Sequence, residues 1–140
     1  MAKKKRCDDD ASKALLWDES FSVRAQVLDK QHKGLFDIIN QLRTACARDV
    51  EKKEVLGIIK SLYTYSATHF QDEEALLEKK VCILLGEQQS HHAIFLDYVI
   101  NLEHKVNSNV ESVDEEVLIF LDTWWKEHIL KVDMQYSKFF

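Results

Sequence analysis

Four histidines lie in line with apolar residues at helical spacing, each in a different predicted helix. They are His32, His69, His92 and His128. One histidine in an apolar core is usually just hydrogen-bonded, but four would each lose their hydration and need a partner. Neutral imidazole is a good ligand for iron, zinc or copper, so a shared metal site would supply that partner. The pattern therefore predicts a metal site inside a helical core.

Two carboxylates follow these histidines along the chain. Glu73 comes four residues after His69, so the two side chains share one face of a helix. The charge of Glu73 on an apolar face also needs a partner, and helix bundles are a known place for dimetal sites built from such pairs. Asp133 comes five residues after His128, which leaves it about 140° around an ideal helix. Asp133 can therefore join the site only if the chain bends or the helix ends there.

Four amphipathic segments would position these side chains. The predicted helices cover about residues 29–48, 51–79, 84–107 and 112–132, with Asp29 as the cap of the first. In the fourth helix, the residues predicted to face the core are Val117, Leu121, Trp124 and His128. Short connections between long amphipathic helices indicate an all-α fold, an antiparallel up-down-up-down four-helix bundle.

The composition agrees with a small helical domain. The chain has 140 residues, of which 46% are hydrophobic and 31% are charged, and it has no proline and only three glycines. Turn-rich β architectures usually need more of both residues. The net charge of -5 argues against nucleic-acid binding. No apolar run approaches the roughly 18 residues that would cross a membrane.

The two ends of the chain differ in composition. Residues 1–14 are predicted to be a flexible charged tail, and residues 15–140 one bundle domain. The bundle is expected to begin with an extended N-terminal arm, because residues 15–28 lack clean helical periodicity. The arm would attach to the core through Trp17, Phe21 and Val23.

The cysteines and the first residues indicate the cellular compartment in which the protein is expected. The three cysteines are Cys7, Cys46 and Cys82, an odd number without a CxxC pair, so a disulfide framework or a thiolate zinc site is not expected. Residues 1–10 lack the apolar segment of a signal peptide. Free thiols are typical of a reducing compartment, which predicts a cytoplasmic location.

Several short motifs, taken in order, resemble those of the hemerythrin family, specifically the bacterial hemerythrin-like domains known as bacteriohemerythrins. The resemblance covers about residues 15–136. Its motifs are Trp17-Asp18 in the arm, Asp29-Lys30-Gln31-His32, His69-Phe70-Gln71-Asp72-Glu73-Glu74, His92-Ala93-Ile94-Phe95-Leu96, and His128-Ile129 ending at Asp133, with Tyr136 following. Each motif alone is weak, but the combination is specific.

The resemblance implies a non-haem di-iron centre, bridged by an oxo or hydroxo group, that binds O2 reversibly for transport, storage or supply. Carried over position by position, the ligands of one iron would be His32 and His69, and those of the other His92 and His128. Glu73 and Asp133 would bridge the two irons. The family uses the same five-residue step that separates His128 from Asp133.

One ligand position departs from the family pattern. The family has a further histidine four residues before the position of His92, and this chain has Gln88 there. Gln88 could ligate through its amide oxygen, or water or another exogenous ligand could fill the vacancy. The third alternative is loss of the second iron or its rescue by His91, which lies about 100° from His92 on a helix. The residues 81–83 also replace the family's Gly-Tyr-Pro turn.

The expected function is O2 binding without enzymatic turnover, with one qualification. A missing histidine would open a further coordination position, so faster autoxidation or a weak oxidase- or peroxidase-like activity is a hypothesis for this chain. The alternatives are an oxygen or redox sensor module with an unidentified redox or signalling partner, and an iron-binding, oxidase-like or zinc-filled bundle. The chain leaves no room for an output domain, which favours a stand-alone role. His91 and His104 are expected at the surface.

Overall fold

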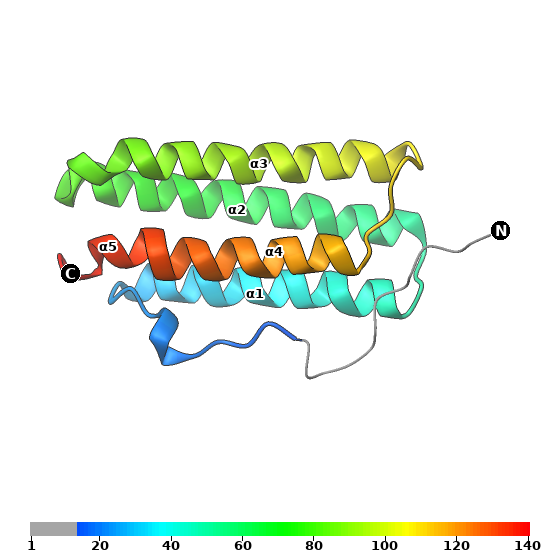
Figure 1. Cartoon of the computed structure of the whole chain (residues 1–140), viewed down its shortest axis with the longest axis horizontal. Coiled ribbons are helices and arrows are strands. Elements are labelled where there is room, and N and C mark those ends of the chain that lie inside the picture. Colours follow the sequence, from blue (N-terminus) through cyan, green and yellow to red (C-terminus); the bar gives the residue numbers. More distant parts are fainter. Residues whose placement is uncertain (1–13) are drawn as a thin grey trace.

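The computed structural model describes residues 14–140, and these form four long helices without a β-strand. The helices are α1 (Gln26–Ala47), α2 (Lys52–Lys80), α3 (Leu85–Asn107) and α4 (Glu115–Glu127). Figure 1 shows them side by side and alternating in direction, which confirms the predicted antiparallel bundle. The predicted flexible tail, residues 1–14, lies outside the described residues except for Ala14.

Two helices begin at residues other than the predicted ones. In each case the side chain of an aspartate, Asp29 or Asp114, has a role that the sequence did not predict. Asp29 does not cap α1, which begins three residues earlier after Ala25. Its carboxylate instead accepts hydrogen bonds from the arm, from the Val23 backbone N–H at 2.8 Å and the Ser22 hydroxyl at 2.6 Å. The cap of α4 is Asp114, whose side chain accepts from the backbone N–H of Val117. That helix therefore begins later than predicted.

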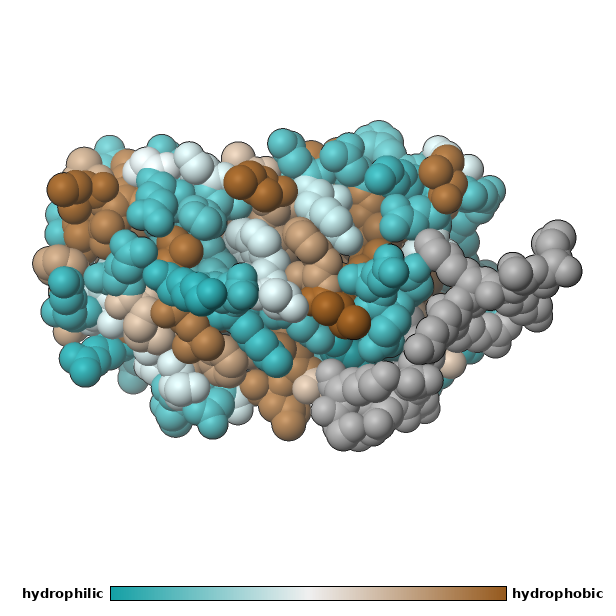
Figure 2. Space-filling view, in the orientation of Figure 1, coloured by the Kyte–Doolittle hydropathy of each residue, from teal (hydrophilic) through white to brown (hydrophobic). Residues whose placement is uncertain are grey.

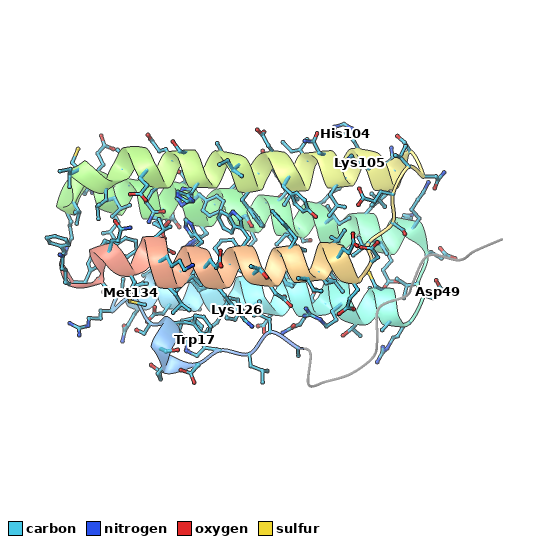
Figure 3. All side chains as sticks on the ribbon, viewed as in Figure 1. Trp17, Asp49, His104, Lys105, Lys126 and Met134 are labelled. Carbon is cyan, nitrogen blue, oxygen red and sulfur yellow. The ribbon has the colours of Figure 1, made fainter. Side chains whose placement is uncertain are left out.

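The extended arm runs along the bundle beside α1 (Figure 1). Phe21 and Val23 are buried as predicted, and Leu15 is buried with them. Trp17 is only half-buried, with its ring centroid 5.9 Å from that of Phe36, and Figure 3 shows it on the arm below the helices. The arm is therefore attached by apolar contacts along its length.

A polar clamp at Asn40 holds the start of the arm. The side-chain oxygen of Asn40 accepts from the backbone N–H of Leu15 at 2.8 Å, and its amide nitrogen donates to the Leu15 carbonyl at 2.8 Å. Arg43 donates to the same Asn40 oxygen at 2.8 Å and pairs with Asp122 of α4. One amide thus joins the arm, α1 and, through Arg43, α4.

The C-terminal end of α4 changes its helical type. The segment His128–Asp133 is a π-helical turn, and it continues into the short helix α5 (Met134–Ser137). In a π-helix the backbone hydrogen bond runs from residue i to residue i+5, so residues five apart return to one face. The predicted bend or helix end is therefore wrong in form, because a wider turn of continuous helix brings Asp133 back toward His128.

The core-facing stripe of α4 also differs by one residue from the predicted one. Trp125 is completely buried, whereas Trp124 is half-buried. On the face seen in Figure 2, hydrophilic side chains are interspersed with separate apolar groups. No helix among residues 14–140 is long and apolar enough to cross a membrane.

Substitution of Asn40 by alanine tests the clamp. Asn40→Ala leaves both backbone groups of Leu15 without their partner, and we expect the free energy of unfolding to fall by about 1–3 kcal/mol. Urea unfolding of the metal-free protein measures the change. Asn101→Ala on the exposed side of α3 is the matched control and should have little effect. Equal stability of the two variants would contradict a role for the clamp.

Candidate metal centre

All seven residues predicted for the metal site lie in the core at one end of the bundle. The helices α1, α2 and α3 and the π-helical turn that follows α4 each supply part of the set, and each side chain is at most 3% exposed. The residues are His32 from α1, His69 and Glu73 from α2, Gln88 and His92 from α3, and His128 and Asp133 from the π-helical turn. The structure thus brings together the residues that sequence spacing and the family resemblance selected.

The first half of the site contains His32 and His69. Their Nε2 atoms face each other at 3.0 Å. His69 Nε2 also lies 3.6 Å from a carboxylate oxygen of Glu73, and His32 Nε2 lies 3.3 Å from one of Asp133. One donor atom from each of His32, His69 and Glu73 falls within 4.8 Å of the other two, a spacing that could hold a metal ion.

The second half contains His92 and His128. His92 Nε2 lies 2.8 Å from Glu73 Oε1, and His128 Nε2 lies 2.9 Å from Asp133 Oδ1. Despite these short distances, both imidazole nitrogens lack a partner in hydrogen-bonding geometry. Glu73, His92 and His128 form a second triad with donor atoms within 4.8 Å of one another. Glu73 therefore belongs to both triads.

Each carboxylate spans the two halves. Glu73 presents Oε2 to His69 and Oε1 to His92, while Asp133 presents Oδ2 to His32 and Oδ1 to His128. Each carboxylate therefore lies between a histidine of the first half and a histidine of the second half. Imidazole and carboxylate together suit iron or another first-row transition metal, and unpartnered donor atoms at buried positions fit such an ion.

Protonation of one histidine would balance part of the negative charge in the core. Burial alone would lower the pKa of His128, but the Asp133 and Glu73 carboxylates outweigh it and raise the pKa to about 9. Burial of Asp133 would raise its pKa, yet His128 and His32 hold it well below its usual range. Burial lowers the pKa of His69 to about 3, so that ring is neutral. A metal ion would compete with the proton on His128.

Two histidines of the site are oriented by partners that sequence reasoning did not assign. His69 Nδ1 lies 2.6 Å from Gln31 Oε1, and the Gln31 amide nitrogen donates to Asp72 at 2.8 Å. His92 Nδ1 lies 2.8 Å from Glu74 Oε2. Both partners are acceptors, so each ring carries its hydrogen on Nδ1 and turns the lone pair of Nε2 toward the site. Both residues stand in the quoted motifs, but motif position alone gives them no role.

Tyr136 supplies a further contact that spacing does not predict. Its hydroxyl donates to Glu73 Oε2 at 2.7 Å. Burial, followed by the charges of Asp133 and Glu73, raises the pKa of Tyr136 well above its ordinary value, so the hydroxyl keeps its proton. Tyr136 therefore remains a donor and fixes the orientation of the shared carboxylate.

Gln88 faces the site rather than solvent. Its amide nitrogen donates to Asp133 Oδ1 at 2.8 Å, and its Oε1 has no hydrogen-bond partner in the part of the chain that the structure describes. An ionised carboxylate only accepts hydrogen bonds, so the Gln88 atom beside Asp133 must be the NH2 group. The carbonyl oxygen is consequently the free, buried end of this amide.

The two other histidines, His91 and His104, do not belong to this cluster of core side chains. His104 is exposed and points away from the bundle on the outer side of α3 (Figure 3). The side chain of His91 is 39% exposed, and its Nε2 lies 3.9 Å from the Glu87 carboxylate. Its ring lies 5.8 Å from that of His128, at the edge of the site. The expected surface position is confirmed for His104, and His91 is intermediate.

Comparisons with known proteins agree with this geometry. The family model described as "Hemerythrin HHE cation binding domain" matches residues 24–139. The bacteriohemerythrin of Methylococcus capsulatus is 27% identical over 117 residues, covering 84% of this chain and 88% of that protein. The bacteriohemerythrin of Clostridium acetobutylicum is 29% identical over 125 residues, covering 86% and 97%.

The fold is shared with solved structures as well. A structure described as wild-type hemerythrin superposes with a TM-score of 0.82 at 26% sequence identity, covering 89% of this chain and 95% of that one. The resemblance read from the sequence motifs is therefore confirmed over most of the chain. This chain belongs to the hemerythrin family.

Proposed function

We propose that this protein holds a pair of non-haem iron ions in its core and binds O2 there reversibly. The observation that carries the proposal is that Glu73 and Asp133 each present one oxygen to each pair of histidines. Such shared carboxylates suit two ions held close together. A bridged iron pair, when bound, supplies the electrons that make O2 binding reversible.

The protein's own part is to hold the ligands and to exclude water. His69 and His92 are fixed with their Nε2 lone pairs inward, as Gln31 and Glu74 require. Aromatic rings pack against two of the histidines, since Phe70 stacks on His92 at 3.8 Å and Trp124 stacks on His128 at 4.5 Å between ring centroids. An apolar cover slows the entry of water, which would otherwise favour loss of electrons from ferrous iron.

Gln88 makes the two halves of the site unequal. We propose that its amide anchors Asp133 through the NH2 group and offers Oε1 as a weak ligand where the family has a histidine. His91 does not replace that histidine in our proposal, because it faces Glu87 and solvent. An amide oxygen is a harder and weaker donor than imidazole, so the ion beside His92 and His128 should be held less tightly.

The remaining expectations belong to the same proposal. O2 binding without enzymatic turnover is the main function, and the weaker ligand at Gln88 allows some oxidase- or peroxidase-like activity. A cytoplasmic location, an unidentified redox partner and a bundle domain over residues 15–140 stay predictions.

Iron analysis and an optical spectrum test the di-iron proposal. We expect two irons per chain and near-ultraviolet charge-transfer bands of a bridged diferric pair, which zinc cannot give. His32→Ala should lose iron because it removes a donor of the first triad. His104→Ala, at an exposed position, is the matched control and should keep the full iron content. A protein that binds only zinc, or a spectrum without these bands, would reject the proposal.

Gln88→His tests the inequality of the two halves. Imidazole in place of the amide should tighten binding of the second metal equivalent by roughly tenfold or more. It should also slow the oxidation of ferrous iron in air. Metal titration and stopped-flow absorbance measure the two effects, and Gln89→His at the neighbouring exposed position is the control. Faster oxidation in Gln88→His, or slow oxidation already in the unchanged protein, would count against a weak ligand at Gln88.

Metal uptake should release the proton of His128. Because the pKa of His128 is raised to about 9, this ring is protonated at neutral pH and must lose its proton to ligate. The apparent affinity for Zn2+ should therefore rise with pH and level off above about 9. Calorimetry in buffers of different ionisation enthalpy counts the protons released. An affinity that does not change with pH below this value would show that His128 is already neutral.

A further inference from the structure

A small cavity in the surface reaches a histidine in the second half of the site. It has a volume of about 200 Å³ and lies between α3 and the π-helical end of α4, and we name it the His91 cavity. Its lining residues are His91, Trp124, Glu127, His128, Lys131 and Val132. At roughly 30 Å³ for each water molecule, this volume holds a cation with several waters. The Nε2 atom of His128 lies 2.9 Å from Asp133 Oδ1, so this ring stands between the cavity and the core.

The ring of His128 is not held by a hydrogen bond at its Nδ1 atom. Nδ1 of His92 lies 2.8 Å from Glu74 Oε2, whereas Nδ1 of His128 has no hydrogen-bond partner among residues 14–140. The His128 ring can therefore turn without breaking a hydrogen bond at this atom. Such a turn would let an ion pass from the His91 cavity into the second half of the site.

Two side chains beside the cavity are spaced to share a cation. His91 Nε2 lies 3.9 Å from Glu87 Oε1, and the two residues are four apart on α3. Metal ions such as Zn2+ lie about 2.1 Å from nitrogen and oxygen donors, so two donors of one ion stand up to about 4 Å apart. The His91 ring lies 5.8 Å from the His128 ring, measured between centroids. An ion on His91 and Glu87 is thus already beside a histidine of the core.

A second cavity, which we name the Lys60 cavity, offers a less suitable route. It has a volume of about 520 Å³, lies between α1 and α2, and also reaches a core histidine, His69. The residues that line it include Lys60 but no carboxylate. The His91 cavity is lined by the carboxylate of Glu127, although Lys131 Nζ lies 3.6 Å from that group. A carboxylate attracts a metal cation and an ammonium group repels it, so charge favours the His91 cavity.

We propose that divalent metal ions enter and leave the second half of the site through the His91 cavity, where His91 and Glu87 first capture the ion and Lys131 opposes its approach. The inference rests on the proposed metal centre and adds the route by which the centre is filled. Capture residues lower the same barrier for entry and for release, so they change both rates and leave the affinity unchanged. A permanent ligand would instead change the affinity.

Stopped-flow absorbance with Co2+ tests the capture step. We expect His91→Ala to slow both Co2+ uptake by the metal-free protein and Co2+ release to a chelator by about threefold or more, with unchanged affinity. Glu87→Gln should act in the same direction. His104→Ala removes another exposed histidine of α3 and should leave both rates as they are. All these positions are exposed or half-exposed, so the variants should keep the fold.

Two lysine variants test which cavity the ion uses. Lys131→Gln removes the positive charge beside the His91 cavity, and uptake should become about twofold faster or more, with a smaller gain at high salt. Lys60→Gln makes the same change of charge beside the Lys60 cavity and should have little effect. Faster uptake in Lys60→Gln, with no change in Lys131→Gln, would place the route at the other cavity and overturn the proposal.

The outcomes separate this inference from the proposed function. If the unchanged protein binds neither iron nor Co2+, the proposed function is wrong and the route falls with it. If metal binds and the rates of His91→Ala and Glu87→Gln equal those of the unchanged protein, only the route is rejected. A loss of affinity in His91→Ala would make His91 a permanent ligand and would likewise reject its role in capture.

Discussion

Much of this structure depends on two negative charges in the centre of an apolar bundle. Glu73 and Asp133 are completely buried, and the transfer of two neighbouring carboxylates from water into such a core is strongly unfavourable unless cations accompany them. The two carboxylates raise the pKa of His128 to about 9, which favours a proton on this ring when no metal ion is bound. One proton balances only part of the charge. The four histidines around the pair could hold metal cations that complete the balance, which agrees with the proposed iron site.

The place of Asp133 in the site depends on a departure of its helix from regular geometry. A regular α-helix would turn Asp133 away from His128, and the carboxylate would leave the site. The π-helical turn His128–Asp133 inserts the extra residue within a continuous helix, so both side chains face the core. Such turns are uncommon and concentrate at functional sites. Helical periodicity therefore predicts His69 and Glu73 from the sequence alone, but it places Asp133 outside the site, and only the family resemblance brings it in.

Sequence reasoning predicts features that belong to one helix and misses contacts between distant parts of the chain. The four histidines and the bundle follow from apolar periodicity, because each stripe is a property of one helix. The hydrogen bond of Asp29 to the arm, the approach of Gln31 to His69 and the contact of Tyr136 with Glu73 join distant parts of the chain or compete with a local role. The spacing of residues along the chain does not predict these contacts. Trp124 and Trp125 show a finer limit, since adjacent aromatic residues differ by only about 100° and the sequence does not say which of them faces the core.

The orientation of the ligand rings comes from the edge of the bundle rather than from its centre. In the centre, Nδ1 of His32 and Nδ1 of His128 have no hydrogen-bond partner among residues 14–140. His69 is held through Gln31 by the exposed Asp72, and His92 by the partly exposed Glu74. The partners differ in charge, since an amide accepts from His69 and a carboxylate from His92. A carboxylate partner makes an imidazole a stronger donor. In the proposed iron site, Glu74 would therefore make His92 a stronger ligand in the half that contains Gln88. This effect would offset part of the metal affinity that the replacement of a family histidine by Gln88 removes.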